Sequence, residues 1–305
     1  MNFPFYIARR YLFSKKKHNA INIISGISVC GVALATLALV CTLSVFNGFQ
    51  DMVASFFTAF DPQLKITVRE GKVFDGQDKR IGVVCLLPEV DVFTETLEEN
   101  AMVQYKDRQA MVVLKGVEDN FEELTAIDSI LYGAGDFLLH DSIVNYGVMG
   151  GELVATLGTG LQFVDPLQVY LPKRNAKVNM ANPGASFNRD YLYSPGVVFV
   201  VNQQEYDGKY ILTSLDFLRQ LLDYTTEVSA IELKLKPGAN VSSVQAKIEK
   251  ILGNDFIVQN RYQQQADVFR IMEIEKLISY LFLTFILMIA CFNVIGSLSM
   301  LILDK

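Results

Sequence analysis

The residues that could perform chemistry in this chain are few and scattered. Its 305 residues include two histidines, His18 and His140, and four cysteines. No H-E-x-x-H, C-x-x-C or G-x-S-x-G sequence occurs, so the chain predicts neither a metal centre nor a catalytic triad. A P-loop sequence is also absent, which excludes ATP hydrolysis by that route. We therefore expect a non-enzymatic protein that uses no metal and no cofactor.

The cysteines predict no disulfide. Cys30, Cys41 and Cys291 fall inside long apolar runs, which leaves Cys85 without a partner in the polar part of the chain. The apolar text at 83–87 predicts a buried strand around Cys85. A reactive thiol at that position is the alternative.

Two uncharged runs are the elements around which the rest must be arranged. Residues 19–50 and 277–303 contain no Asp, Glu, Lys or Arg. At about 1.5 Å per helical residue, each run can cross a hydrocarbon core about 30 Å thick. The first run exceeds a signal-peptide core, and no small-x-small cleavage site follows it. We predict two transmembrane helices.

Charge is distributed unevenly around these runs. Basic residues precede the first run, and acidic residues are frequent between the two runs. By the positive-inside rule the N-terminus is cytoplasmic and the large intervening segment lies on the outer side of the membrane. We interpret the basic residues as a topology signal and expect no nucleic-acid partner. They are Arg9, Arg10, Lys15, Lys16 and Lys17.

The intervening segment alternates between strand and helix patterns. Leu64, Ile66 and Val68 alternate with polar residues, as in a half-buried strand, whereas Leu215, Leu218, Leu221 and Leu222 fall on one helical face. This alternation predicts a mixed α/β domain between the spans. Strands are predicted at 64–68, 83–87, 90–95, 101–105, 110–117, 167–171, 197–201, 231–236 and 256–258, and helices at 120–125, 150–157, 214–224 and 241–251.

The division of the chain follows from these patterns. Residues 262–276 have no helix breaker and should continue into the second span as a stalk. We predict a cytoplasmic amphipathic segment at 1–18, a span at 19–50, an outer domain at 51–261, a stalk at 262–276, a span at 277–303 and a cytoplasmic end at 304–305.

Small and polar residues within the spans predict helix packing. Gly31 and Ala35 are spaced i, i+4, which lets transmembrane backbones approach closely. Asn293 and Ser297 repeat this spacing in the second span, where polar side chains usually face protein.

Residues 173–195 differ from their surroundings. They are rich in Asn, Ser, Gly, Pro and basic side chains, and lie between two predicted strands. A segment of this length in a compact domain is often functional or disordered. We predict a projecting hairpin; a hairpin without a partner is the alternative.

Both ends of the chain carry a resemblance. The start Ala8-Arg9-Arg10-Tyr11-Leu12, the end of the first span at 43–50 and the closing text 292–305 resemble the permeases of the lipoprotein-releasing ABC transporter, the LolC and LolE family. This family lies within the MacB and FtsX permease superfamily. In the outer domain only the order of elements and Leu114-Lys115-Gly116-Val117 agree.

The resemblance implies an inner-membrane permease with a MacB-like periplasmic core. Its partners would be a cytoplasmic ABC ATPase subunit, a second permease copy or sister permease, a lipoprotein substrate in membrane lipid, and a periplasmic LolA-type carrier. Motion of the stalk would couple ATP hydrolysis in the partner to the outer domain. By position, the carrier-binding candidates in the hairpin are Arg174, Met180, Pro183, Phe187 and Tyr191.

Apolar side chains near the outer ends of the spans are candidates for contact with acyl chains. They are Val45, Phe46, Phe49, Met52, Phe56, Phe57, Leu277, Tyr280 and Leu281. Ordinary contact with lipid or with another helix is the alternative.

The chain departs from the family pattern at its end. Family members have two further spans, so we expect this chain to be truncated after its second span or completed by another chain. Two other functions stay open: an FtsX-type permease that regulates cell-wall hydrolases, and a two-span sensor whose outer domain binds a small ligand.

Overall fold

The computed structural model describes residues 3, 6, 19–55, 60–174, 186–264 and 266–303. Within its helices, the side chains of 19–25, 49–55, 266–269, 271–273, 293, 297, 298 and 300–303 are outside that description. The chain divides into two compact units. The helix unit comprises Met1–Ser55 and Ala266–Lys305, and the domain unit comprises Phe56–Gln265.

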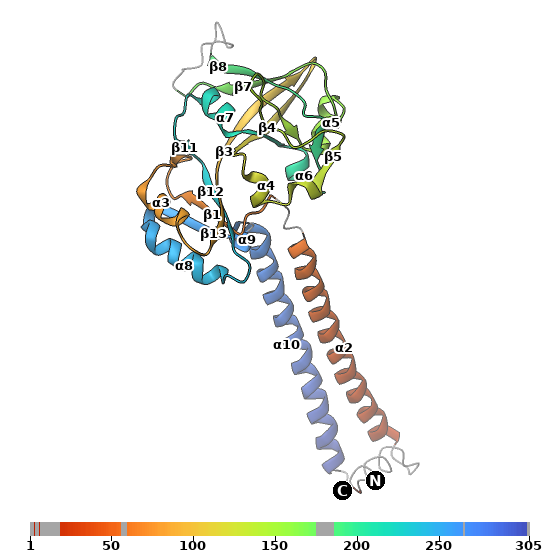
Figure 1. Cartoon of the computed structure of the whole chain (residues 1–305). Helices are drawn as coiled ribbons and strands as arrows, with labels where there is room; N and C mark the ends of the chain where they lie inside the picture. Colours follow the sequence, from red (N-terminus) through yellow and green to blue (C-terminus); the bar gives the residue numbers. More distant parts are fainter. Residues whose placement is uncertain are drawn as a thin grey trace. The chain divides into compact units, whose positions relative to one another are not determined.

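The helix unit contains two long helices that lie alongside each other (Figure 1), α2 (Asn19–Ser55) and α10 (Ala266–Leu303). Gly26–Gly48 and Ile274–Gly296 have mean hydropathies of 2.4 and 2.3 and are long and apolar enough to cross a membrane. Helix α10 includes most of the predicted stalk without interruption. The start of that stalk forms a separate short helix, α9 (Arg261–Gln264), and Gln265 lies outside the described residues.

The domain unit is built on a nine-stranded sheet in the order β13-β1-β12-β3-β4-β10-β6, with β7 paired to β3 and β8 paired to β7. Strands β4 and β10 are parallel and the other described pairs of this sheet are antiparallel. The strands are β1 (Leu64–Val68), β3 (Val90–Tyr105), β4 (Arg108–Val117), β6 (Val148–Met149), β7 (Leu167–Pro172), β8 (Phe187–Leu192), β10 (Tyr210–Ser214), β12 (Ala230–Leu235) and β13 (Phe256–Asn260).

Smaller elements complete the domain. Two-strand pairs form between β2 (Phe74–Asp75) and β11 (Glu227–Val228), and between β5 (Leu131–Gly133) and β9 (Val197–Phe199). The helices are α3 (Lys79–Cys85), α4 (Phe121–Leu124), α5 (Gly151–Leu157), α6 (Gln204–Asp207), α7 (Leu215–Leu222) and α8 (Val241–Leu252), with 3₁₀ turns at Ile127–Ile130 and Gly253–Asp255.

Local sequence explains where the two longest domain helices begin and end. The Ser214 hydroxyl accepts from the Phe217 amide at the start of α7, and Asn240 caps α8 by accepting from the Ser243 amide. Helix α7 ends at Asp223, which adopts a left-handed conformation with φ of 56°. These caps satisfy backbone groups that the helix ends would otherwise leave unpaired.

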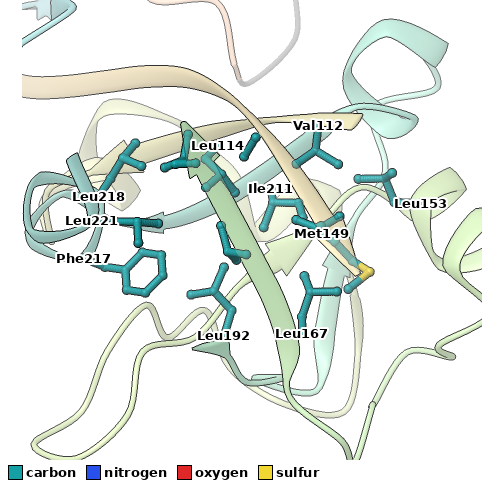
Figure 2. Packing of buried hydrophobic residues seen from close by; sticks show 14 of the residues in the cluster. Val112, Leu114, Met149, Leu153, Leu167, Leu192, Ile211, Phe217, Leu218 and Leu221 are labelled. Carbon is teal, nitrogen blue, oxygen red and sulfur yellow. The ribbon is translucent and has the colours of Figure 1, made fainter. Parts of the chain in front are cut away.

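Three apolar cores hold the domain together. Helix α7 and the strands β4, β7 and β10 enclose the largest one, in which Leu114, Ile211 and Phe217 are almost fully buried (Figure 2). A second core lies between α8 and the strands β1, β12 and β13. The third joins Phe60 and Phe121 to the β5–β9 pair. The mixed α/β domain predicted from alternating patterns is confirmed.

The prediction of a buried strand around Cys85 is wrong. The segment forms α3, which begins at its cap Asp78, and Cys85 is exposed. Ile81 and Val84 are spaced i, i+3 and are the buried residues of this helix. The apolar run was misleading because Val83 and Leu86 in it face solvent.

Two further differences concern strands. The strands predicted at 90–95 and 101–105 are one continuous strand, β3, because it pairs with β12 from Val90 to Thr96 and with β4 from Thr96 to Tyr105 without a gap. The predicted hairpin 173–195 contains the strand β8, which pairs with β7 over its whole length. Its sequence is polar because this strand lies at the edge of the sheet.

Candidate functional site

The acyl-contact candidates with described side chains face outward from the helix unit. Val45, Leu277, Tyr280 and Leu281 are exposed and Phe46 is half-buried. Phe49 and Met52 lie on α2, but their side chains are outside the description, and Phe56 and Phe57 lie outside the described residues altogether. The candidates with described side chains are therefore exposed or half-buried on the two helices.

Four buried residues with described side chains lie on α2 and α10, and three of them are small. Ser28 and Ala35 are buried on α2, and Leu283 and Ala290 are buried on α10. The predicted packing role of Ala35 fits this burial. Gly31 is half-buried, but a Cβ placed there would meet nothing within 4 Å, so it makes no close helix contact in the described structure. The side chains of Asn293 and Ser297 lie outside the description.

The carrier-binding candidates lie at the paired strands β7 and β8. Pro172 pairs with Phe187 at the end of the ladder, where the chain leaves the sheet. Arg174 lies over the Tyr224 ring at 5.1 Å, and Tyr191 is exposed on β8. Met180 and Pro183 lie outside the described residues.

One side chain fixes this ladder to the rest of the domain. The Asn188 amide donates to the Leu221 carbonyl oxygen over 2.7 Å, which ties β8 to the C-terminal end of α7. The base of the hairpin is thus held by the sheet and by α7.

His140 lies beside a carboxylate at a polar hollow. Its Nδ1 lies 3.6 Å from Asp119 Oδ1, beside a polar hollow of about 380 Å³ at the carboxyl ends of β4 and β10. Arg219 at this hollow binds Glu95 at 2.7 Å. In the part of the chain that the structure describes, no three side chains are placed to hold a metal ion.

A row of four charged side chains crosses the sheet, two of them buried and two partly exposed, and no sequence pattern predicted it. Lys115 Nζ contacts Glu232 Oε1 at 2.6 Å, with side chains that are only 3% and 0% exposed. Lys65 Nζ contacts Glu98 Oε1 at 3.2 Å, and 3.6 and 3.8 Å contacts link the two pairs. We call Lys65, Glu98, Lys115 and Glu232 the charge row.

The charge row lies under the third core. Lys115 Nζ is 5.5 Å from the centre of the Phe121 ring, which covers it. Glu232 Oε2 has no hydrogen-bond partner among the described residues. Burial favours the neutral form of Glu98, but the ammonium groups of Lys65 and Lys115 outweigh it and lower the Glu98 pKa to about 2. Lys115 and Glu232 are inaccessible to solvent, so we expect this row to contribute to stability.

A second polar cluster lies where the domain begins and ends. Arg261 Nε donates to the Asp61 carbonyl oxygen over 2.9 Å, and Gln264 Nε2 donates to the Pro62 carbonyl oxygen over 3.1 Å. We call Asp61, Pro62, Arg261 and Gln264 the base clasp. It joins the first described residues of the domain unit to its last ones.

Comparison with known proteins identifies the family of this domain. The model of the MacB-like periplasmic core domain matches residues 25–251. The chain belongs to this family. The expected resemblance to LolC and LolE is confirmed in the same comparison: the lipoprotein-releasing system transmembrane protein LolC of Xylella fastidiosa is 22% identical over 301 residues, covering 98% of this chain and 70% of the relative.

Another relative and one solved structure are also similar to this chain. The lipoprotein-releasing system transmembrane protein LolE of Haemophilus influenzae is 23% identical over 318 residues, covering 100% of this chain and 72% of the relative. The periplasmic region of MacB from Actinobacillus actinomycetemcomitans is 11% identical, covers 67% of this chain and 91% of its own, and superposes with a TM-score of 0.44.

Proposed function

We propose that this MacB-family chain is a permease subunit of an ABC transporter that extracts lipoproteins from the inner membrane and passes them to a periplasmic carrier. One observation carries the proposal: nearly the whole chain, including both apolar helices, aligns with proteins named for lipoprotein release. The N-terminus would be cytoplasmic and the domain unit periplasmic, because the basic residues precede the first helix.

The partners follow from the same proposal. The sequence holds no P-loop, so a separate ATPase subunit would hydrolyse ATP. A second permease copy or a sister permease would complete the transporter, and a LolA-type carrier would receive the lipoprotein. Movement of α10, which has no described break from Ala266 to Leu303, would transmit the ATPase motion to the domain.

The exposed candidates on the two helices would hold the acyl chains. Introducing a charge by Phe46→Asp or Tyr280→Asp is expected to reduce lipoprotein release several-fold, because a charge is costly in an apolar site. ATP-dependent release from proteoliposomes measures this. Tyr280→Phe is the matched control and should release normally. Normal release by both charged variants would exclude an acyl site there.

The hairpin between β7 and β8 would hold the carrier. Replacing residues 175–185 by a short Gly-Ser turn leaves all six β7–β8 residue pairs in place, and we expect it to abolish capture of a LolA-type carrier in a pull-down. Lys250→Ala, on the exposed face of α8, is the control and should capture the carrier normally. Undiminished capture by the shortened hairpin would exclude residues 175–185 as the carrier site, whereas no capture by the native chain would contradict the lipoprotein function and favour another role within the family.

A further inference from the structure

The strands β13 and β1 lie next to each other at one edge of the sheet of the domain unit. They pair antiparallel from Leu64 with Asn260 to Val68 with Phe256. Strand β1 follows the junction with α2, and β13 precedes the junction with α10. Helix α2 ends at Ser55, and α10 begins at Ala266, two positions after the clasp residue Gln264. Both links to the helix unit therefore leave from one end of a single strand pair.

The base clasp closes this end of the strand pair. Its two hydrogen bonds run from side chains after β13 to backbone carbonyls before β1, so they join the segments that lead to the two helices. Asp61 is buried, and its Oδ1 accepts from the Tyr206 hydroxyl over 3.1 Å. Burial and the Asp61 carboxylate raise the Tyr206 pKa, so this hydroxyl stays protonated and keeps donating.

Neighbouring groups fix both sides of the clasp. The Phe60 ring stacks on Tyr206 with centroids 5.4 Å apart, which holds the segment before β1. On the other side, Gln263 Oε1 accepts from Gln245 Nε2 over 2.8 Å and from the Asn260 amide over 3.0 Å. Gln245 is buried on α8, so the segment after β13 is tied to the second core.

The opposite end of the same strand pair has an equivalent contact. Arg69 Nε donates to the Asn254 carbonyl oxygen over 2.8 Å, and the Arg69 amide donates to Asp255 over 2.8 Å. Arg69 and Arg261 thus make the same type of bond across β1 and β13. Only Arg261 lies at the end where the chain leaves for the helices, which makes Arg69 an internal control.

We propose that the base clasp fixes the spacing of the two segments that link the domain to α2 and α10, and that Arg261 and Gln264 are positioning residues for transport. The transport role rests on the proposed function, whereas the spacing role does not. With the clasp present, the two helices can move the domain only as one body. Without it, the segment before β1 and the segment after β13 can move separately.

Spin labels test the spacing role directly in the full chain. One label replaces Val45 on α2 and one replaces Ile274 on α10, both exposed positions, in a background with the four cysteines changed to serine. The double variant Arg261→Ala with Gln264→Ala is expected to broaden the distribution of label distances, and Arg69→Ala is expected to leave it unchanged. Equal distributions in both variants would overturn the proposal.

Transport by the complete complex tests the positioning role. Losing two hydrogen bonds raises the population of molecules with an open base clasp about five- to thirty-fold. Lipoprotein release per ATP hydrolysed should therefore fall at least about five-fold in the Arg261→Ala, Gln264→Ala variant. Arg261→Lys with native Gln264 keeps a hydrogen-bond donor at position 261 and should retain most of the release activity. The thermal unfolding temperature of each variant shows whether a loss of release reflects weaker coupling or a less stable domain.

The outcomes are distinguishable from failure of the proposed function. If the native chain with its ATPase releases no lipoprotein, the proposed function fails, while the label distances still decide the spacing role. If the clasp variant and Arg69→Ala lose release in proportion to their loss of thermal stability, the clasp is only a structural contact and the proposal is wrong.

Discussion

Replacing Lys115 by methionine is expected to destabilise the domain by roughly 3–5 kcal/mol, because it leaves a buried carboxylate without its main partner. Glu232 is fully buried, and its 2.6 Å contact with Lys115 is the closest ion pair it has. Lys65, at 3.8 Å, compensates only in part. Methionine keeps the length of the aliphatic stem, so the loss comes mainly from the charge. For a domain of this size the unfolding temperature should fall by roughly 10 °C.

A matched exposed pair provides the control. Lys72 contacts Glu99 at 3.4 Å, but its side chain is 78% exposed. Lys72→Met should change the unfolding free energy by less than about 1 kcal/mol, since water replaces the lost partner. Urea unfolding of the full chain in detergent, followed by far-ultraviolet circular dichroism, measures both. Similar losses in the two variants would mean that Glu232 does not depend on Lys115.

The double variant Lys115→Met with Glu232→Leu extends the test. Removing both charges leaves no charged side chain without a partner, because Lys65 and Glu98 still bind each other at 3.2 Å. We expect it to be more stable than Lys115→Met alone, as is usual when a buried pair is replaced by apolar residues. A double variant that is less stable than the single one would show that the rest of the charge row depends on Glu232.

The charge row also shows where sequence patterns stop being informative. Alternation in β1 and β12 located both strands, because their apolar side chains fill the second core. Alternation alone does not show that the polar face that carries Lys65 and Glu232 is covered. Their burial depends on the loop and helix that carry Phe60 and Phe121, which cover this face from distant parts of the chain. Such a covering layer has no local signature.

The helix unit was more predictable than the domain surface. Length and lack of charge alone located both apolar helices, since crossing a membrane requires both properties. The clasp was not predicted, because Arg261 and Asp61 are 200 positions apart and Arg261 binds a backbone carbonyl, which no residue type marks. The prediction of a buried strand around Cys85 failed for a local reason. Val83 and Leu86 are exposed, although apolar residues in a continuous run are usually expected to be buried.

Acid is expected to weaken the domain through Glu98. The Glu98 pKa falls from 4.5 to about 2 on folding, since the charges of Lys65 and Lys115 outweigh the effect of burial. A carboxyl group with a depressed pKa contributes stability above its unfolded pKa and loses it as the pH falls through the folded one. The contribution of Glu98 should therefore be complete above about pH 5 and disappear towards pH 2, with a total of roughly 3 kcal/mol.

Glu98→Gln isolates this contribution. Glutamine keeps the shape and can still accept from Lys65, but it carries no charge at any pH. Asp78, Asp141 and Glu227, whose pKa values are also lowered by hydrogen bonds, titrate in both proteins and cancel in the difference. The gap in unfolding free energy between the native chain and Glu98→Gln should be largest near pH 6 and shrink steadily below pH 4.5. A gap that does not change with pH would mean that Glu98 gains no stability from the charges of Lys65 and Lys115.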